Sequence, residues 1–331
     1  MTRDRPVLRT VPRRAGDRSG PEGPPRPTWF VVGPRRARWL TERKDQTLVE
    51  QFEGRVAVVT GAASGIGLGL AHRAAAEGMS VVMADVEADA LSAASDDVAS
   101  RGAEVMAVRC DVTDEQSVAE LARRVSDAHG ACDLLFNNAG VSAGGPMWEV
   151  SEADWDWVIG VNLTGVARCI RHLVPPMIAR GGGHVVNTAS MAGLSAMPST
   201  GPYSASKHAV VAMSEILAHD LTLAGSDVGV SVLCPGWVVT GLMESDRNRP
   251  GGPRPEDPDS EASPEQEAFR EAVRSAFEAG ISPEEVATTV FEAVRQGRFW
   301  ILTHEDWNRV AEVRCRDILE GRSPTLELWP I

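Results

Sequence analysis

The chain has 331 residues, of which 43% are hydrophobic and 24% are charged, as in ordinary soluble globular proteins. Its net charge of −13 argues against general nucleic-acid binding, because the neutralisation of phosphates requires Lys and Arg. The five cysteines are scattered without CxxC or Cys/His ligand spacing, which indicates reduced thiols in a cytoplasmic protein and no zinc site. No apolar run reaches the ~18 residues of a membrane-spanning helix.

Residues 1–50 are rich in Arg, Pro and Gly and carry twelve Lys/Arg against six Asp/Glu. No periodicity runs through them, so we expect a disordered or spuriously translated basic leader. A basic arm for nucleic acid or a membrane surface is one alternative. A transit peptide is another, but Asp4, Asp17 and Glu22 count against it, and no apolar region follows.

Apolar strand-like runs and helical stretches alternate through residues 51–303, and this order predicts a single α/β domain. Parallel βαβ units should form a doubly wound, Rossmann-like sheet of about seven strands, with helices on both faces. Ser/Thr residues with Asp, Glu or Gln three positions later predict helix starts at Thr113, Ser151 and Ser282. The helix after Ser151 should run unbroken past Asn162 toward Ile178. Strands are expected at 55–60, 80–85, 105–110, 134–136, 184–188, 228–233 and 299–302.

Two later segments depart from this pattern. Residues 247–263 are rich in Pro, Gly and acidic side chains, which predicts a polar insertion that forms a mobile flap. Residues 264–279 and a stretch from Pro283 should be helical. A C-terminal helical tail is expected over 304–331, with its helix from about Asp306 to Leu319.

The first strand leads directly into a glycine-rich loop that opens a helix, Thr60-Gly61-Ala62-Ala63-Ser64-Gly65-Ile66-Gly67. Glycines allow backbone N–H groups to approach a pyrophosphate, whose charge a helix N-terminus stabilises. The spacing is G-x-x-x-G-x-G and not G-x-G-x-x-G, so a plain tight turn is the alternative. As a nucleotide site, the loop would contribute Gly61, Ser64, Gly65, Ile66 and Gly67.

Asp85 ends the second predicted strand, where a carboxylate can accept hydrogen bonds from both hydroxyls of an adenosine ribose. The same carboxylate would repel the 2′-phosphate of NADP by about 4 kcal/mol at ~4 Å and an effective dielectric near ~20. No Arg or Lys lies in the loop or just after Asp85 to offset this repulsion. We therefore expect NAD as cofactor and consider NADP less favoured; the alternative is that Asp85 only caps a helix.

The only tyrosine of the chain, Tyr203, precedes Lys207, one of two lysines, by four residues. On a helix this spacing places both side chains on one face. An ammonium beside a phenol lowers the phenol's pKa, and a fall from about 10 to roughly 7 requires about 4 kcal/mol. Lys207 together with a cationic cofactor could supply this stabilisation, which would make Tyr203 a general acid/base. The alternative is a solvated surface pair.

A nucleotide loop, a strand-end Asp and a Tyr-x-x-x-Lys helix in one Rossmann-like unit resemble the short-chain dehydrogenase/reductase family. The resemblance covers roughly residues 52–303, and further motifs follow in family order. Asn137-Asn138-Ala139-Gly140 resembles the family's NNAG, Asp111-Val112 its adenine-side pair, and Pro235-Gly236-Trp237-Val238-Val239-Thr240 the motif beside the nicotinamide. Asn162 and Ser190 match the family's relay asparagine and substrate-orienting serine.

The resemblance implies a catalytic tetrad of Asn162, Ser190, Tyr203 and Lys207. Tyr203 would exchange a proton with the substrate oxygen, and Ser190 would orient that oxygen. Lys207 would bind the nicotinamide ribose, and Asn162 would hold a relay water. Cofactor contacts are also implied for Asp111, Val112, Asn138, Ala139, Gly140, Pro235, Gly236, Val238 and Thr240. Assembly into a homodimer or homotetramer is a further expectation.

The loops after the fourth, fifth and sixth strands should line the substrate pocket. They are apolar and short of positive charge, which favours a hydrophobic secondary alcohol or ketone over phosphorylated, CoA or carboxylate substrates; alternatively, several of these side chains pack the loops. Two rival functions remain: an NAD sensor without turnover, and a nucleic-acid-associated protein acting through residues 1–50. The pocket residues expected are Trp148, Met191, Leu194, Met197, Trp237, Leu242 and Met243.

Overall fold

The computed structural model describes residues 51–252 and 264–326, all within one compact unit, Asp45–Ile331. The predicted leader at 1–50, residues 253–263 of the predicted flap and the last five residues lie outside the described residues.

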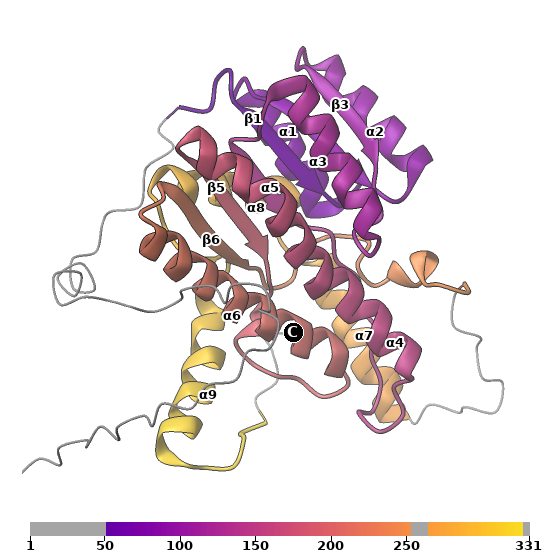
Figure 1. The fold of residues 1–331 in the computed structure, drawn as a ribbon. Helices are drawn as coiled ribbons and strands as arrows, with labels where there is room; N and C mark the ends of the chain where they lie inside the picture. The colour runs from indigo at the N-terminus through magenta and orange to yellow at the C-terminus, as the bar shows by residue number, and fades with distance from the viewer. Residues whose placement is uncertain (1–50, 253–263, 327–331) are drawn as a thin grey trace, which may run out of the picture. The chain divides into compact units, whose positions relative to one another are not determined.

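The described chain forms a seven-stranded sheet in which every neighbouring pair is parallel (Figure 1). The strand order is β3-β2-β1-β4-β5-β6-β7, so strands are added first to one side of β1 and then, from β4 onward, to its other side. This arrangement confirms the predicted doubly wound sheet, and ligands bind such sheets at the carboxyl ends of the strands beside this switch point. The strands are β1 Val56–Thr60, β2 Ser80–Asp85, β3 Val105–Arg109, β4 Leu134–Asn137, β5 Gly183–Thr188, β6 Val228–Cys234 and β7 Trp300–Leu302.

Alternate side chains of the central strands enter two separate apolar layers. Ala57 and Val59 of β1 pack with α1 Gly65–Ala76, α2 Ala88–Ser100 and α8 Pro283–Arg295. Val56 and Val58 pack on the opposite face with three other helices. Because both faces are covered, the strands are nearly continuous apolar runs, as the sequence indicates. The helices of the second face are α3 Glu115–His129, α5 Val166–Arg180 and α6 Gly201–Ala224.

The C-terminal residues extend the core beyond the last strand. Trp307 and Val310 are buried in one cluster with Trp237 of the loop after β6. The Trp237 and Trp307 rings meet edge to face, with centroids 5.4 Å apart. This part of the structure includes α7 Pro264–Glu278, the short 3-10 helix η5 Glu305–Trp307 and α9 Asn308–Glu320.

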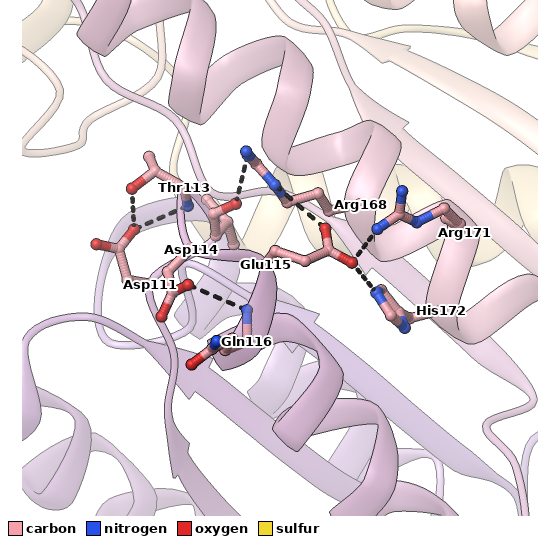
Figure 2. Close-up of polar contacts among 9 residues, drawn as sticks. Asp111, Thr113, Asp114, Glu115, Gln116, Arg168, Arg171 and His172 are labelled. Atoms are coloured by element: carbon pink, nitrogen blue, oxygen red, sulfur yellow. Dashed lines mark hydrogen bonds and ion pairs between the residues drawn. The ribbon is translucent and has the colours of Figure 1, made fainter.

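The predicted cap of α3 is wrong by one residue. Asp114 caps the helix, and its carboxylate accepts from the Gln116 N–H at 3.0 Å (Figure 2). The Thr113 hydroxyl donates instead to Asp111, at 2.7 Å. The carboxylate two residues before Thr113 therefore takes the hydroxyl that the prediction assigned to the helix. The capping box at Ser282 and Glu285 is confirmed.

The long helix expected after Ser151 is interrupted. Ser151 caps α4 Glu152–Ile159, but a π-helical turn, η2 Gly160–Gly165, precedes α5. A Cβ placed on Gly165 would lie 2.7 Å from the Val112 side chain, so the turn brings the backbone against the residues that follow β3. Such turns occur often at functional sites, and this one contains Asn162.

The five cysteines are free thiols, as predicted. Within the described ranges, none of the helices combines the length and the apolar character needed to cross a bilayer.

Candidate active site

The glycine-rich loop packs too closely for side chains at two of its glycines. A Cβ on Gly67 would lie 1.9 Å from the Gly61 carbonyl oxygen, and one on Gly61 would lie 2.8 Å from the Ala139 Cα. Gly61 also has a φ of +66°, which favours glycine. Helix α1 begins at Gly65 after Ser64, whose side chain makes no capping hydrogen bond. The first N–H groups of the helix thus form the kind of terminus that binds phosphate.

Asn138 fastens this loop to the end of β4. Its amide donates to the Thr60 and Gly61 carbonyls at 3.1 and 3.3 Å, and the Thr60 hydroxyl accepts from the Asn138 and Ala139 N–H groups at 2.9 and 3.1 Å. The Thr188 hydroxyl at the end of β5 donates to the side-chain amide oxygen of Asn138 at 3.4 Å. The polar side chains of this motif therefore connect the ends of three strands and fix the loop's position.

Asp85 is anchored by its neighbours at the end of β2. One carboxylate oxygen accepts from the Ala63 N–H at 3.0 Å and the other from the Glu87 N–H at 3.1 Å. The N-cap of α2 is Glu87, so Asp85 is not the simple helix cap of the alternative interpretation. Each oxygen retains acceptor capacity for a ribose hydroxyl.

Two arginines approach this region from distant parts of the chain. Arg109, paired with Asp85 across β2 and β3, donates to the Val86 carbonyl at 3.4 Å. Arg247, from the loop after β6, binds the Glu87 carboxylate. Residue order around Asp85 could not reveal either guanidinium, since both reach it through the fold.

Helix α5 supports the predicted adenine-side residues. Arg168 donates to the Val112 carbonyl at 3.3 Å, and Arg168, Arg171 and His172 surround Glu115 at the start of α3 (Figure 2). The Val112 side chain is buried, whereas Asp111 is exposed and its carboxylate binds Thr113.

The structure brings Ser190, Tyr203 and Lys207 together at the carboxyl ends of β5 and β6. Ser190 follows β5, and its hydroxyl accepts from the Ala192 N–H at 3.1 Å. Lys207 lies one turn after Tyr203 on α6, with Nζ 5.6 Å from the centre of the Tyr203 ring. Nζ donates to the Thr188 carbonyl at 2.8 Å, and only 3% of Lys207 is exposed. The pair is therefore not a solvated surface pair.

The pKa values of these two groups move in opposite directions. Burial raises the pKa of Tyr203 above its ordinary value, and a hydrogen bond with Ser190 partly offsets the rise. Burial lowers the pKa of Lys207 to about 8. Lys207 alone therefore does not lower the Tyr203 pKa, because desolvation disfavours both charged forms, and the expected lowering with a cationic cofactor bound stays a prediction.

Asn162 is fully buried and clamps the loop after β4. Its amide oxygen accepts from the Val141 N–H at 2.9 Å, and its amide nitrogen donates to the Val141 carbonyl and to the Ser206 hydroxyl at 2.9 and 3.1 Å. Both amide hydrogens are thus used, so a relay water would have to bind at a carbonyl oxygen. A Cβ on Gly140 would lie 3.5 Å from Lys207 Nζ and 3.6 Å from the Asn162 amide oxygen, which places the loop between these two residues.

The loop after β6 contacts the glycine-rich loop. A Cβ on Gly65 would lie 3.0 Å from the Thr240 methyl group. The Pro235 carbonyl accepts from the Met191 N–H at 3.0 Å, and Val238 is buried beside Ile281. His304 accepts from the Gly236 N–H at 3.2 Å, a contact from the C-terminal segment that sequence reasoning missed.

Five of the seven predicted pocket residues fall into two groups, and the other two, Leu194 and Leu242, are half-buried. Met191, Met197 and Trp237 are buried in the core cluster that contains Trp307, so the alternative interpretation, packing of the loops, holds for these three. Trp148 and Met243 are 85% and 53% exposed. Apolar side chains thus remain available only on part of the predicted lining.

The residues present fit a nicotinamide dinucleotide. The glycine loop offers backbone N–H groups at a helix N-terminus, the anchored Asp85 carboxylate offers acceptors for hydroxyls, and Lys207 provides an ammonium at the other end of the site. These groups lie along the carboxyl edge of the sheet, from β2 across β1 to β5.

Comparisons with known proteins agree with this geometry. Residues 55–251 match the family model described as short chain dehydrogenase. The chain is 38% identical over 291 residues to 1-deoxy-11-beta-hydroxypentalenate dehydrogenase of Streptomyces exfoliatus, covering 84% of this chain and 95% of the relative. It is 41% identical over 199 residues to cis-4-hydroxycyclohexanecarboxylate dehydrogenase of Sinomonas cyclohexanicum, covering 59% of this chain and 77% of the relative.

Among solved structures, a short-chain dehydrogenase/reductase from Burkholderia phymatum in complex with NAD superimposes with a TM-score of 0.78. The two proteins are 44% identical, and the match covers 85% of this chain and 99% of the other. Fold and site define an oxidoreductase that uses a nicotinamide cofactor and acts on hydroxyl or ketone groups. The chain belongs to the short-chain dehydrogenase/reductase family.

Proposed function

We propose that this protein is an NAD-dependent dehydrogenase that interconverts a hydrophobic secondary alcohol and its ketone, with Tyr203 as the acid/base. The main support is the buried ammonium of Lys207, which lies one helical turn after Tyr203 with Nζ 5.6 Å from the centre of its ring, beside Ser190 at the end of β5. The Tyr203 phenol and the Ser190 hydroxyl are proposed to bind one substrate oxygen together. This arrangement suits general acid/base catalysis at a carbonyl or carbinol.

The roles of the side chains follow from their positions. Ser190 orients the substrate oxygen, and Tyr203 gives that oxygen a proton or removes one from it. Lys207 holds the nicotinamide ribose and favours the phenolate by its charge. Asn162 fixes Gly140 and Val141 against Lys207, so that the floor of the site stays in place. The bound cofactor supplies the hydride chemistry.

Asp85 supports NAD as the cofactor. Its carboxylate is held by two backbone N–H groups and would lie against a 2′-phosphate. Arg247 is paired with Glu87, which reduces its capacity to offset that repulsion. The relative from Burkholderia phymatum was solved with NAD.

The substrate is proposed to be an alicyclic or aryl secondary alcohol. The exposed apolar side chains of Trp148 and Met243 favour a hydrophobic compound. Two relatives, by their names, are dehydrogenases of alicyclic hydroxy acids, so the carboxylate-bearing alcohols that we disfavoured on charge belong among the candidates.

Self-association is proposed through the helices next to the site. Ile178 of α5 and Ile216 and Leu223 of α6 are 41%, 59% and 45% exposed, so these apolar side chains are available for contact with a second copy of the chain. Sedimentation of the purified protein would test this; a monomer at all concentrations would refute it.

The test of function is NADH formation at alkaline pH, with NAD and NADP offered in parallel to a panel of alicyclic and aryl alcohols. We expect turnover with NAD, and we expect Tyr203→Phe to bind NADH normally while losing about 10²–10⁴-fold in kcat. Substantial residual activity of Tyr203→Phe would contradict the acid/base role. NADH binding without turnover across the panel would favour a cofactor sensor.

A further inference from the structure

The segment that follows β6 is tied to three distant parts of the chain. We call residues 241–252 the strap. It begins directly after Thr240, which lies against the glycine-rich loop. The sequence predicted a mobile flap from residue 247, but the described part, 247–252, carries two of these three attachments.

The first attachment is to the loop after β4. Ser245 is buried, and its hydroxyl accepts from the Ser142 N–H and donates to the Ser142 carbonyl, each at 3.0 Å. This reciprocal pair holds the middle of the strap against the residues that precede α4.

The second attachment is beside Asp85. The Glu87 carboxylate accepts from Arg247 Nε at 3.0 Å and from the Asn248 amide at 2.7 Å, and Arg247 Nη2 lies 2.8 Å from the same carboxylate. Arg247 Nη1 also donates to the Gly241 and Glu244 carbonyls at 3.0 Å. One guanidinium therefore holds the shape of the strap and joins it to the end of β2.

The third attachment is to α4. Arg249 Nε donates to the Asp154 carboxylate at 2.8 Å, and the two side chains are 17% and 3% exposed. The corresponding exposures of Arg247 and Glu87 are 41% and 28%. The Asp154–Arg249 pair is thus the more buried of the two and is expected to be harder to break, whereas solvent and salt screen the partly exposed Glu87–Arg247 pair more strongly.

The order of the strands shows which part of the sheet the strap crosses. The strap leaves the sheet at β6 and reaches the end of β2, and β5, β4 and β1 lie between them. It therefore passes over the carboxyl edge where the glycine loop, Asn138 and Ser190 lie. A dinucleotide bound there would have the strap across it.

We propose that Glu87 and Arg247 are positioning residues that form a latch, which closes the strap over the bound dinucleotide and sets the rate of cofactor release. The strap pivots on the buried Asp154–Arg249 pair, and the more exposed Glu87–Arg247 pair opens. This inference rests on the proposed function, because it requires a nicotinamide cofactor in the site.

The first test measures NADH dissociation by stopped-flow fluorescence in Arg247→Ala and Glu87→Gln. The second substitution keeps the backbone N–H that binds Asp85. We expect each variant to release NADH about three- to tenfold faster, the double variant to match the single ones, and Arg247→Lys to restore part of the effect. The wild-type rate should rise toward the variants' rates in high salt. The control is Arg123→Ala, which breaks a more exposed ion-pair cluster with Glu120 and Asp127 on α3.

The second test needs no cofactor: hydrogen exchange of peptides from 241–248 in the ligand-free protein. We expect faster exchange in Arg247→Ala than in the wild type and no change in Arg123→Ala. Wild-type rates of both exchange and NADH release in the variants would overturn the latch. Failure of the wild-type protein to bind NADH would instead overturn the proposed function, so the two failures can be distinguished.

Discussion

Lys207 is expected to destabilise the cofactor-free protein that depends on it for activity. Burial lowers the pKa of its ammonium from 10.5 to about 8, a difference of 2.5. At about 1.36 kcal/mol per pKa unit, the buried charge is unfavourable by about 3 kcal/mol at neutral pH. Lys207→Met removes this charge but leaves the Thr188 carbonyl without its donor, a loss of about 1 kcal/mol. The variant should therefore be inactive and about 2 kcal/mol more stable at pH 7.

The direction of the pKa shift determines how the free energy of unfolding changes with pH. The folded-state pKa of Lys207 is lower than its unfolded value, so the destabilisation is complete below about pH 8 and disappears as the pH rises toward 10.5. The wild type should gain about 2 kcal/mol between about pH 8 and pH 9.5, and the gap to Lys207→Met should close. Urea unfolding at fixed protein concentration measures both quantities. A variant that is less stable than the wild type at pH 7, or a gap independent of pH, would refute the reasoning.

Two further variants test the role of Asp85 in the cofactor site and that of Arg249 in the strap. Asp85→Ala combined with Val86→Arg should shift the preference toward NADP by removing the repelling carboxylate; unchanged kcat/KM ratios for the two cofactors would mean that Asp85 does not face the ribose. Arg249→Ala should lower the free energy of unfolding by about 3–5 kcal/mol, because the buried Asp154 carboxylate loses its guanidinium. Urea unfolding measures this loss, and a loss below about 1 kcal/mol would show that water replaces the arginine.

The sheet could be predicted from the sequence because its strands are buried on both faces. Runs such as Val56–Thr60 and Val228–Cys234 are almost wholly apolar and stand between helical stretches. The residues of the tetrad could be predicted because their spacing matches a known family. The structure places Ser190, Tyr203 and Lys207 together, and their catalytic roles remain a prediction.

Other features depend on contacts between residues far apart in the sequence, which local patterns do not show. Arg247 and Glu87 are 160 residues apart, and Gly236 and His304 are 68 apart. The polar composition of 247–263 indicated a flap, since nothing in it revealed that Arg249 has a buried carboxylate partner. The prediction that Thr113 caps α3 was wrong because two neighbouring carboxylates compete for these contacts. Asp111 accepts from the Thr113 hydroxyl, and Asp114 accepts from the helix N–H.

The ionisation of Tyr203 can be measured directly, because it is the only tyrosine of the chain. Near-ultraviolet tyrosinate absorbance therefore reports this one phenol. In the cofactor-free protein its pKa should lie above the ordinary value of about 10, since burial outweighs the hydrogen bond from Ser190.

The same measurement with saturating NAD tests whether the bound cofactor stabilises the Tyr203 phenolate. The protein alone disfavours both the phenolate and the ammonium, so a lowered Tyr203 pKa requires the positive charge of the oxidised nicotinamide ring. We expect the pKa to fall on NAD binding in the wild type and to fall less in Lys207→Met. A pKa at or below its ordinary value without cofactor would mean that the protein already supplies the charge. A pKa that NAD leaves unchanged would separate Tyr203 from the nicotinamide and contradict its role as acid/base.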